Sequence, residues 1–304
     1  MTSGHSVKQA LIDIVGENNL LIDELIRNYT YTKLGGKADY FVMPTSVEHV
    51  QAIVKLANQE QMPFTLLGNG SNLIVRDGGI RGIVMSLKHL NHIQHNGEVV
   101  IAQSGARIID TSYYALDQSL SGLEFACGIP GTVGGALYMN AGAYGGEIKD
   151  CLKEAVVVDR TGEKLTLSLD ELELDYRTSN IPDHGYIVIE ARFQLQRKEQ
   201  AAIKEVMDDL TERRESKQPL EYPSCGSVFK RPPGYFAGKL IQDSDLQGKG
   251  IGGAEVSTKH AGFIVNKANA TAKDYIAVIE MVQAKVKENF DVELEREVRI
   301  LGEE

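Results

Sequence analysis

The chain has 304 residues, 42% of them hydrophobic and 24% charged, and its 32 basic and 42 acidic side chains give a net charge of −10. At roughly 100 to 200 residues per domain, this length predicts two domains with a core large enough to fold without disulfides or metals. Sequence-independent binding to nucleic acid or anionic lipid requires a cationic face. The net charge of −10 opposes such binding and predicts a small molecule or a protein as partner.

The first half of the chain predicts an N-terminal helical region followed by short strands. Apolar residues at helical spacing between Ser6 and Arg27 indicate one or two short helices. Next come a strand over 39–43, a helix over 45–59 with a capping box of Thr45 and Glu48, and a strand over 64–67, together a βαβ-like unit. The remaining elements expected here are strands at 73–75, 82–87 and 99–103 and a helix around 107–118.

The second half predicts mixed short elements without regular alternation of strand and helix. A hairpin is expected over 154–167, a long strand over 185–195, and a charged helix over 199–217 that leads to a new unit. Four of the eight prolines fall within 219–233, which indicates a stiff, extended loop. The last elements expected are a helix over 236–243, a strand over 262–265, a helix over 274–289 capped by Thr271, and a strand over 292–301. This order indicates an α+β fold, not a doubly wound sheet.

Glycine is concentrated in three stretches. The residues Gly248, Gly250 and Gly253 match the spacing GxGxxG, but that fingerprint must follow a strand and open a helix, whereas this one follows an expected helix. We therefore expect a loop there and not a dinucleotide site.

The other two glycine stretches are candidates for binding an anion. The loop after the strand at 64–67, Gly68 to Asn72, could turn its amides toward a phosphate or could be a plain hairpin, and the pattern alone does not decide. The stretch from Gly128 to Glu147 is too long and too apolar for a turn. A short helix over 132–139 would point the amides of Gly131, Thr132 and Val133 at an anion. Two such loops near each other would suit a dinucleotide pyrophosphate.

Six segments in chain order carry a resemblance to a known family: 31–38 (YTKLGGKA), 67–75 (LGNGSNLIV), 128–147, 175–179 (DYRTS), 223–230 (PSCGSVFK) and 294–299 (LEREVR). Together they resemble the UDP-N-acetylenolpyruvoylglucosamine reductase family, flavoenzymes of peptidoglycan precursor synthesis. The resemblance covers nearly the whole chain. It is to the shorter, type II subclass, because there is no room after Phe229 for the tyrosine-bearing loop of longer members, which leaves open what covers the uridine.

The resemblance implies the fold and the reaction. The fold would be α+β: a vanillyl-alcohol-oxidase-type (PCMH-type) FAD-binding domain of two α+β subdomains over 1–203, with its core at about 34–199, and a smaller α+β substrate-binding domain over 204–304, whose last strand returns to the active site. The cofactors would be non-covalent FAD and NADPH, with no metal. The substrate would be a nucleotide sugar, with no nucleic acid partner and no membrane insertion, and a monomer is expected.

The resemblance also implies which residues form the site. Arg177 and Glu297 match the pair that stabilises the intermediate, and Ser227 matches the proton donor. Lys217, Lys230 and His260 match or lie near substrate-contacting positions. The positions implied for FAD are Thr32, Gly35, Gly68, Asn69, Gly70, Ser71, Asn72, Gly128, Ile129, Pro130, Gly131, Thr132, Gly134, Gly135, Gly142 and Tyr144.

Pattern alone favours plainer interpretations of the same residues. Arg177 would be a surface arginine after a turn, Ser227 a loop serine, and Glu297 part of a solvated strand face, because structural charges outnumber catalytic ones. His260 is almost as well interpreted as a structural histidine, and Cys225 as a packed thiol. Two other functions stay open: another FAD-dependent oxidase or dehydrogenase of the same fold, and a non-catalytic flavin- or nucleotide-binding regulator.

The cysteines and the N-terminus bear on the compartment. The three cysteines, odd in number and widely spaced, match neither a disulfide framework nor a metal site. No apolar run approaches the roughly 18 residues of a membrane span, and the N-terminal residues lack a basic segment followed by an apolar one. A cytoplasmic location is therefore expected.

Overall fold

The computed structural model describes residues 6–304. Contacts between Cα atoms divide the chain into two compact units, and neither is a continuous stretch. The first unit comprises Met1–Asp23, Asp39–Asn69 and Gly82–Glu212, and the second comprises Glu24–Ala38, Gly70–Arg81 and Arg213–Glu304. Two short N-terminal stretches therefore fold together with the last third of the chain.

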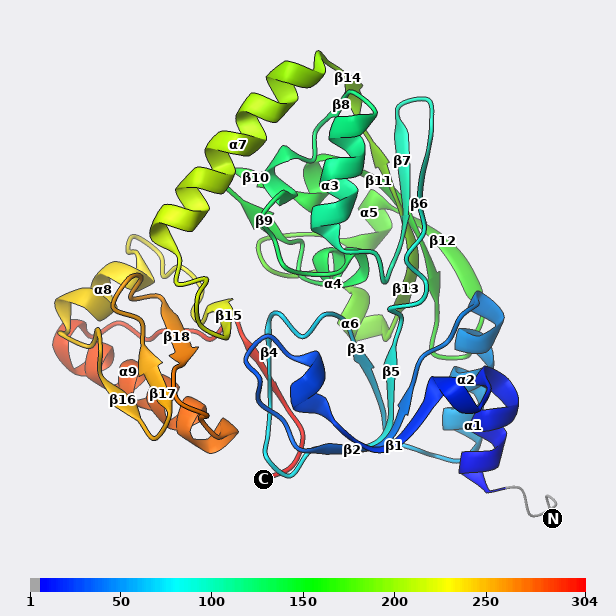
Figure 1. Ribbon diagram of the computed structural model, residues 1–304, viewed down its shortest axis with the longest axis horizontal. Coiled ribbons are helices and arrows are strands. Elements are labelled where there is room, and N and C mark those ends of the chain that lie inside the picture. Colours follow the sequence, from blue (N-terminus) through cyan, green and yellow to red (C-terminus); the bar gives the residue numbers. More distant parts are fainter. Residues whose placement is uncertain (1–5) are drawn as a thin grey trace. The chain divides into compact units, whose positions relative to one another are not determined.

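The elements follow one another in a mixed α+β order, as predicted, and Figure 1 labels most of them. The following elements lie wholly or for the most part in the first unit: α1 (Val7–Val15), β1 (Leu20–Leu25), β2 (Lys37–Val42), α2 (Val47–Gln59), β3 (Phe64–Leu67), β5 (Ile80–Ser86), β6 (Ile93–Asn96), β7 (Val99–Gln103), α3 (Ile108–Asp117), β8 (Leu120–Ser121), α4 (Val133–Tyr138), β9 (Gly142–Ala143), β10 (Gly146–Glu147), β11 (Leu152–Val158), β12 (Lys164–Ser168), α5 (Leu169–Leu172), α6 (Ile181–His184), β13 (Ile187–Gln194), β14 (Gln196–Arg197) and α7 (Gln200–Lys217). The first two residues of β2 and of β5 belong to the second unit. The other elements of the second unit are β4 (Leu73–Val75), β15 (Ser224–Ser227), α8 (Ala237–Asp243), β16 (Gly250–Ile251), β17 (Ala254–Val256), β18 (Phe263–Asn266), α9 (Ala272–Phe290) and β19 (Arg299–Leu301).

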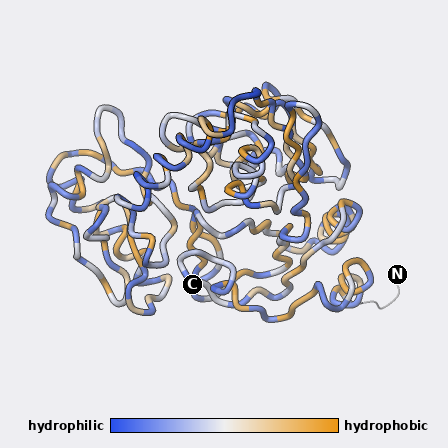
Figure 2. The backbone as a smooth tube through the Cα atoms, turned by 45° about the horizontal axis from the view of Figure 1, so that its top comes forward, coloured by the Kyte–Doolittle hydropathy of each residue, from blue (hydrophilic) through white to orange (hydrophobic). Residues whose placement is uncertain are grey.

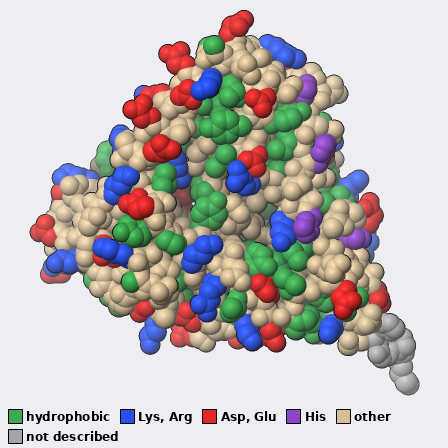
Figure 3. All heavy atoms as spheres, in the orientation of Figure 1, with side chains coloured by type: hydrophobic (Ala, Val, Ile, Leu, Met, Phe, Trp, Pro, Cys, Tyr) green, Lys and Arg blue, Asp and Glu red, His purple; other side chains and the backbone are tan. Residues whose placement is uncertain are grey.

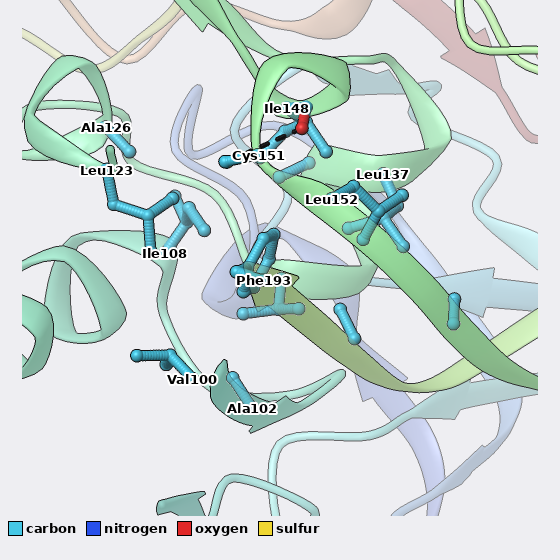
Figure 4. Packing of buried hydrophobic residues seen from close by; sticks show 14 of the residues in the cluster. Val100, Ala102, Ile108, Leu123, Ala126, Leu137, Ile148, Cys151, Leu152 and Phe193 are labelled. Carbon is cyan, nitrogen blue, oxygen red and sulfur yellow. Dashed lines mark hydrogen bonds between the residues drawn. The ribbon is translucent and has the colours of Figure 1, made fainter. Parts of the chain in front are cut away.

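The first unit is built around a five-stranded antiparallel sheet of order β12-β11-β13-β7-β6. The predicted hairpin over 154–167 and the long strand over 185–195 are confirmed as β11, β12 and β13. Phe193 of β13 pairs with Val100 of β7, and both are fully buried. Figure 4 shows Phe193 among the apolar side chains that fill this core. Leu137 of α4 belongs to the same cluster, so this core fixes the helix that follows the second glycine loop.

A second sheet, of order β1-β2-β5-β3, pairs β3 in parallel with β5. The buried faces of α1 and α2 pack with its strands and with residues of β11 and β13 in one core. The strands of the expected βαβ-like unit, β2 and β3, are both present but have β5 between them. Figure 2 shows that hydrophobic and hydrophilic stretches alternate along the backbone.

Two details of the N-terminal region were predicted wrongly. The residues after α1 form strand β1 and not a second helix, because pairing within the sheet overrides their helical spacing. The N-cap of α2 is Ser46, whose Oγ accepts from His49 N at 3.2 Å, and not Thr45. A serine one residue closer to the apolar face satisfies the first-turn amide equally well.

The second unit has an antiparallel sheet of order β15-β18-β17-β16 that packs against α9. The predicted cap of α9 is confirmed: Thr271 Oγ1 accepts from Asp274 N at 3.1 Å, and Asp274 Oδ2 accepts from Thr271 N at 2.9 Å. The C-terminal strand is shorter than predicted, since only Arg299–Leu301 form β19, in parallel with β4. Residues 292–298 instead bury Leu294 and Val298 in the core next to α9.

The third glycine stretch contains a strand, which was not predicted. Gly250 and Ile251 form β16, and Gly252, with φ +54°, lies in the tight turn to β17. A Cβ at Gly253 would lie 2.4 Å from the Ala268 carbonyl oxygen. Left-handed backbone and close approach explain these glycines without any ligand.

None of the helices within residues 6–304 is long and apolar enough to cross a membrane. On the face drawn in Figure 3, acidic and basic side chains are interspersed.

Candidate flavin and substrate site

In the first unit, the first glycine loop contacts the second. The side-chain amide of Asn69 donates from Nδ2 to the Pro130 carbonyl oxygen at 3.1 Å. A Cβ placed on Gly68 would lie 3.1 Å from Thr132 Oγ1, with no other heavy atom within 4 Å. The absence of a side chain at Gly68 therefore leaves the backbone beside Thr132 uncovered by a Cβ, which is what a phosphate needs in order to approach backbone closely.

The start of α4 follows the second loop and is capped by Thr132, whose Oγ1 accepts from Gly135 N at 3.2 Å. The predicted helix is confirmed, but one predicted anion donor is not: Val133 N donates to the Ala106 carbonyl oxygen at 2.8 Å. Gly134 N likewise donates to the Ser104 carbonyl oxygen at 3.0 Å. Within residues 6–304, the amides of Gly131 and Thr132 have no recorded acceptor. These two amides can serve a bound anion, and the residues around them fit the diphosphate of FAD.

Arg177 lies in a tight turn. Asp175 and Thr178 exchange two backbone hydrogen bonds of 3.1 Å, and between them Arg177 has φ +56°. Its Nη2 donates to the Gly142 carbonyl oxygen at 2.9 Å, and its guanidinium lies 5.3 Å from the centre of the Tyr176 ring. Arg177 is half-buried, so it is not simply a solvated surface arginine.

The Arg177 turn therefore adjoins two expected flavin-lining positions. Gly142 begins β9, which pairs with β10 across a turn containing Tyr144. Tyr144 has φ +55°, and 47% of its surface is exposed. The structure thus brings Arg177, Gly142 and Tyr144 together in the first unit.

In the second unit, Gly70 packs against the segment that carries Thr32. A Cβ at Gly70, where φ is +62°, would lie 2.3 Å from the Tyr29 carbonyl oxygen. The Gly70 carbonyl oxygen accepts from Tyr31 N at 3.1 Å, and Thr32 is buried. The plain-hairpin interpretation of this loop is wrong, because β4 pairs with β19 and not with β3.

The remaining residues expected near the flavin, Gly35, Ser71 and Asn72, also belong to this unit. Gly35 has φ +133° and packs against Val75. The side chain of Asn72 donates from Nδ2 to the Glu297 carbonyl oxygen at 3.4 Å, and its own carbonyl oxygen accepts from Arg299 N at 3.2 Å. The glycine loop and the C-terminal segment are thus linked through Asn72.

Ser227 and Glu297 lie on neighbouring backbone segments of the second unit. Ser227 ends β15 and is exposed, and the next residue, Val228, donates from its amide to the Gly262 carbonyl oxygen at 3.0 Å. The Val228 carbonyl oxygen accepts from Glu297 N at 2.8 Å. Glu297 is half-buried and outside any strand, so the interpretation as a solvated strand face is wrong.

The three residues expected to contact substrate differ in their surroundings. Lys217 is the exposed last residue of α7. Lys230 donates from Nζ to Glu295 Oε1 at 2.6 Å. His260 is half-buried, accepts at Nδ1 from Gly262 N at 3.1 Å, and packs edge-on against Phe263; burial lowers its pKa. A neutral ring that accepts at Nδ1 carries its proton on Nε2, which leaves that atom as a donor.

Cys225 is confirmed as a packed thiol. Its Sγ lies 3.2 Å from the Tyr275 hydroxyl, and burial raises the pKa of the thiol to about 12. A thiol that stays protonated is a poor nucleophile.

Two buried asparagines near these residues were not predicted. Asn266 donates from Nδ2 to the Thr32 carbonyl oxygen at 2.9 Å and accepts at Oδ1 from Ala270 N at 2.8 Å. Asn140 is fully buried two residues before Gly142. The only signal in the sequence was the position of Asn140 within the second glycine stretch, which does not identify its partners.

Comparison with known proteins gives the class first. A family model described as "FAD binding domain" matches residues 38–168, which include both glycine loops. With the α+β architecture, this defines an FAD-dependent flavoprotein, as predicted.

The family follows from the rest of the chain. A model described as "UDP-N-acetylenolpyruvoylglucosamine reductase, C-terminal domain" matches residues 218–301. A relative of that name from Oceanobacillus iheyensis is 67% identical over 304 residues, covering 100% of this chain and 99% of the relative. One from Staphylococcus aureus (strain COL) is 60% identical over 297 residues, covering 98% of this chain and 97% of the relative. The crystal structure of a UDP-N-acetylenolpyruvylglucosamine reductase from Thermus caldophilus matches with a TM-score of 0.81 and 32% identity, over 92% of this chain and 98% of that one. The chain belongs to the UDP-N-acetylenolpyruvoylglucosamine reductase family.

Proposed function

We propose that Arg177, Ser227 and Glu297 are the residues of this chain that perform the reaction of its family. That reaction is the NADPH-dependent reduction of the enolpyruvyl group of UDP-N-acetylenolpyruvoylglucosamine to UDP-N-acetylmuramate, in peptidoglycan precursor synthesis. The chemistry that bound FAD would supply is the transfer of a hydride from NADPH to the β-carbon of the enolpyruvyl double bond. The protein must then stabilise the charge that develops and provide a proton.

The proposed FAD site supports this function most directly. Gly68 and Asn69 contact the second glycine loop, and the amides of Gly131 and Thr132 are available to the diphosphate. This arrangement needs few cations, which suits a chain with a net charge of −10. The other residues proposed to hold FAD are Thr32, Gly35, Gly70, Ser71, Asn72, Gly128, Ile129, Pro130, Gly134, Gly135, Gly142 and Tyr144.

Hydride addition to the β-carbon leaves negative charge on the α-carbon and the adjoining carboxylate, as an aci-enolate. A fixed guanidinium stabilises such charge more in the transition state than in the substrate, and the bond from Arg177 to Gly142 fixes its direction. A carboxyl group can stabilise an enolate only by donating a hydrogen bond, so Glu297 would act in its protonated form. Ser227 would give its hydroxyl proton to the α-carbon and be reprotonated from solvent.

The substrate diphosphate needs cations in this acidic chain. We propose Lys217 and Lys230 for that role, and the Nε2 donor of His260 for a polar contact. Lys230 would exchange its ion pair with Glu295 for the substrate.

Three further expectations concern the domains, the location and the oligomeric state. The FAD-binding domain would span 1–203 and the substrate-binding domain 204–304; the family models at 38–168 and 218–301 fall on either side of that boundary. The protein would act in the cytoplasm, where its nucleotide substrates are found. It would act as a monomer of the shorter subclass.

The deciding experiment is an assay of the purified protein. It should be yellow, release FAD on denaturation, and oxidise NADPH only when UDP-N-acetylenolpyruvoylglucosamine is added. NADPH oxidation that does not respond to this substrate, with oxygen as the acceptor for a sugar or alcohol instead, would indicate another enzyme of the same flavin fold. A protein that binds FAD but oxidises no substrate would be a regulator.

A further inference from the structure

Asn140 is a fully buried polar side chain with every hydrogen-bonding atom in use. Nδ2 donates to Glu147 Oε2 at 2.8 Å and to the Asp175 carbonyl oxygen at 3.0 Å. Oδ1 accepts from Lys149 N at 3.0 Å. A buried amide that is fully satisfied by two separate segments, 147–149 and the turn at Asp175, specifies one arrangement of those segments, because any shift leaves a polar atom unpaired.

The three bonds converge on the surroundings of Arg177. The Asp175 carbonyl belongs to the tight turn that carries Arg177, and Asp175 closes that turn with Thr178. Glu147 belongs to β10 and pairs with Gly142 of β9. The Gly142 carbonyl oxygen is in turn the acceptor for Arg177 Nη2. Asn140 therefore fixes both the turn that carries the arginine and the strand that receives its hydrogen bond.

The backbone around this cluster is held in an unfavourable conformation. Asn140 (φ +41°), Tyr144 (φ +55°) and Arg177 (φ +56°) are all left-handed without being glycine. Each such conformation is unfavourable, less so for asparagine, and persists only when its surroundings enforce it. The bond of Asn140 to the Asp175 carbonyl is a contact of this kind at the turn that carries Arg177.

We propose that Asn140 is a positioning residue that sets the direction of the Arg177 guanidinium for the oxidative half-reaction, in which substrate takes the hydride. The inference rests on the proposed role of Arg177. An asparagine is required because the site needs two donors and one acceptor on a short side chain. Aspartate has the same size and can still accept from Lys149 N, but its charged form offers no donor to Glu147 or to the Asp175 carbonyl.

The test compares the two half-reactions of the holoenzyme in Asn140→Asp. Flavin reduction by NADPH and flavin reoxidation by UDP-N-acetylenolpyruvoylglucosamine are followed separately by stopped-flow absorbance. We expect reoxidation to slow by about 10- to 100-fold, since misplacing a catalytic group by about 1 Å can cost 100-fold. Reduction by NADPH should stay within about twofold of wild type.

The matched control is Asn19→Asp. Asn19 is a half-buried asparagine of the first unit between α1 and β1, and its Nδ2 donates to the Val15 carbonyl oxygen at 2.9 Å, with no bond to the cluster around Arg177. It should lower the melting temperature like Asn140→Asp but leave both half-reactions unchanged. If both variants slow reoxidation equally, the effect of Asn140 is general destabilisation and the inference is wrong.

A double-mutant comparison separates this inference from the proposed function. If Asn140 acts through Arg177, Asn140→Asp should add little to the slowing caused by Arg177→Ala. Fully multiplicative effects would overturn the inference, as would slow reoxidation in Arg177→Ala together with normal reoxidation in Asn140→Asp. Normal reoxidation in Arg177→Ala would instead refute the role of Arg177 itself, and the inference with it.

A milder variant covers the case in which Asn140→Asp does not fold. Ser179 Oγ donates to the Tyr138 carbonyl oxygen at 2.9 Å and so holds the other end of the Arg177 turn. Ser179→Ala should slow reoxidation selectively, by about 2- to 10-fold, because the one neutral hydrogen bond that holds this end of the turn is lost. Equal slowing of both half-reactions would contradict a positioning role for this cluster.

Discussion

Gly68→Ala tests whether the contact between the two glycine loops holds FAD. The new Cβ would lie 3.1 Å from Thr132 Oγ1, a few tenths of an ångström closer than ordinary contact, and Gly68 does not have a positive φ. Thr132 cannot turn away freely because its Oγ1 accepts from Gly135 N, a cap that stabilises α4 by about 1 kcal/mol. The FAD-free protein should therefore lose at most about 1 kcal/mol of stability. The affinity for FAD should fall tenfold or more, about 1.4 kcal/mol, because the methyl group would occupy the space in which a phosphate is proposed to approach the backbone.

The measurements are the dissociation constant of FAD, from titration of the FAD-free protein followed by flavin fluorescence, and the unfolding free energy of that protein. Gly238→Ala in α8 is a suitable control, since the nearest atom to its Cβ is 3.5 Å away, and it should change neither quantity appreciably. Gly70→Ala, in contrast, should mainly lower the unfolding free energy of the FAD-free protein. Its positive φ alone costs about 1–2 kcal/mol, and its Cβ would lie 2.3 Å from the Tyr29 carbonyl oxygen. An FAD affinity within twofold of wild type in Gly68→Ala would refute the assignment of this loop to the diphosphate.

The remaining predictions concern the proton donor, the half-buried histidine and the cysteines. Ser227→Ala should retain flavin reduction by NADPH while reoxidation by substrate slows by about 100-fold or more, as seen by stopped-flow absorbance; equal loss in both half-reactions would contradict its role. Burial lowers the pKa of His260 in the folded protein, so as the pH falls below about 6.5 the unfolded chain binds this proton before the folded protein does. The unfolding free energy should therefore decrease as the pH falls, and His260 can contribute at most about 1.4 kcal/mol per pH unit to that slope. In His260→Asn the slope should be smaller. If the unfolding free energy of His260→Asn depends on pH as it does in wild type, His260 is not the group that causes the loss of stability at low pH. Cys127, Cys151 and Cys225 are all buried, so a thiol reagent should modify them only as fast as the protein opens, and rapid modification of the native protein would contradict their burial.

Local patterns predicted most elements of this fold, and they failed where pairing between distant segments decides the conformation. The cap of α9 depends on Thr271 and Asp274 alone, so the sequence contains all the information needed. Strand β1 has the apolar spacing of a helix, but it forms a strand because β2 is available as its partner. Strand β19 is three residues long because its partner β4 is equally short, and β4 lies more than 200 residues earlier in the chain.

The candidate site shows the same limit. The motif residues could be assigned one by one through the resemblance to a family, but the groups that hold them could not. Asn140 lies within the second glycine stretch, but nothing in that pattern assigns it a partner, and its partners Glu147 and Asp175 are 7 and 35 residues away. Single-sequence reasoning detects side chains with distinctive chemistry, whereas a positioning residue is defined only by what it touches.

The glycines illustrate why composition alone could not identify the binding loops. Gly134 and Gly68 belong to the two proposed FAD loops, yet a Cβ at Gly134 would lie 2.1 Å from Ser104 Oγ, while one at Gly68 would enter open space beside Thr132. Gly134 is therefore needed for packing α4 against β7, and its loss would weaken FAD binding indirectly, through the position of the helix. Gly68 is needed for the space itself. A glycine-rich stretch thus combines residues that build a site with residues that border the ligand, and only the atoms facing each missing Cβ distinguish the two.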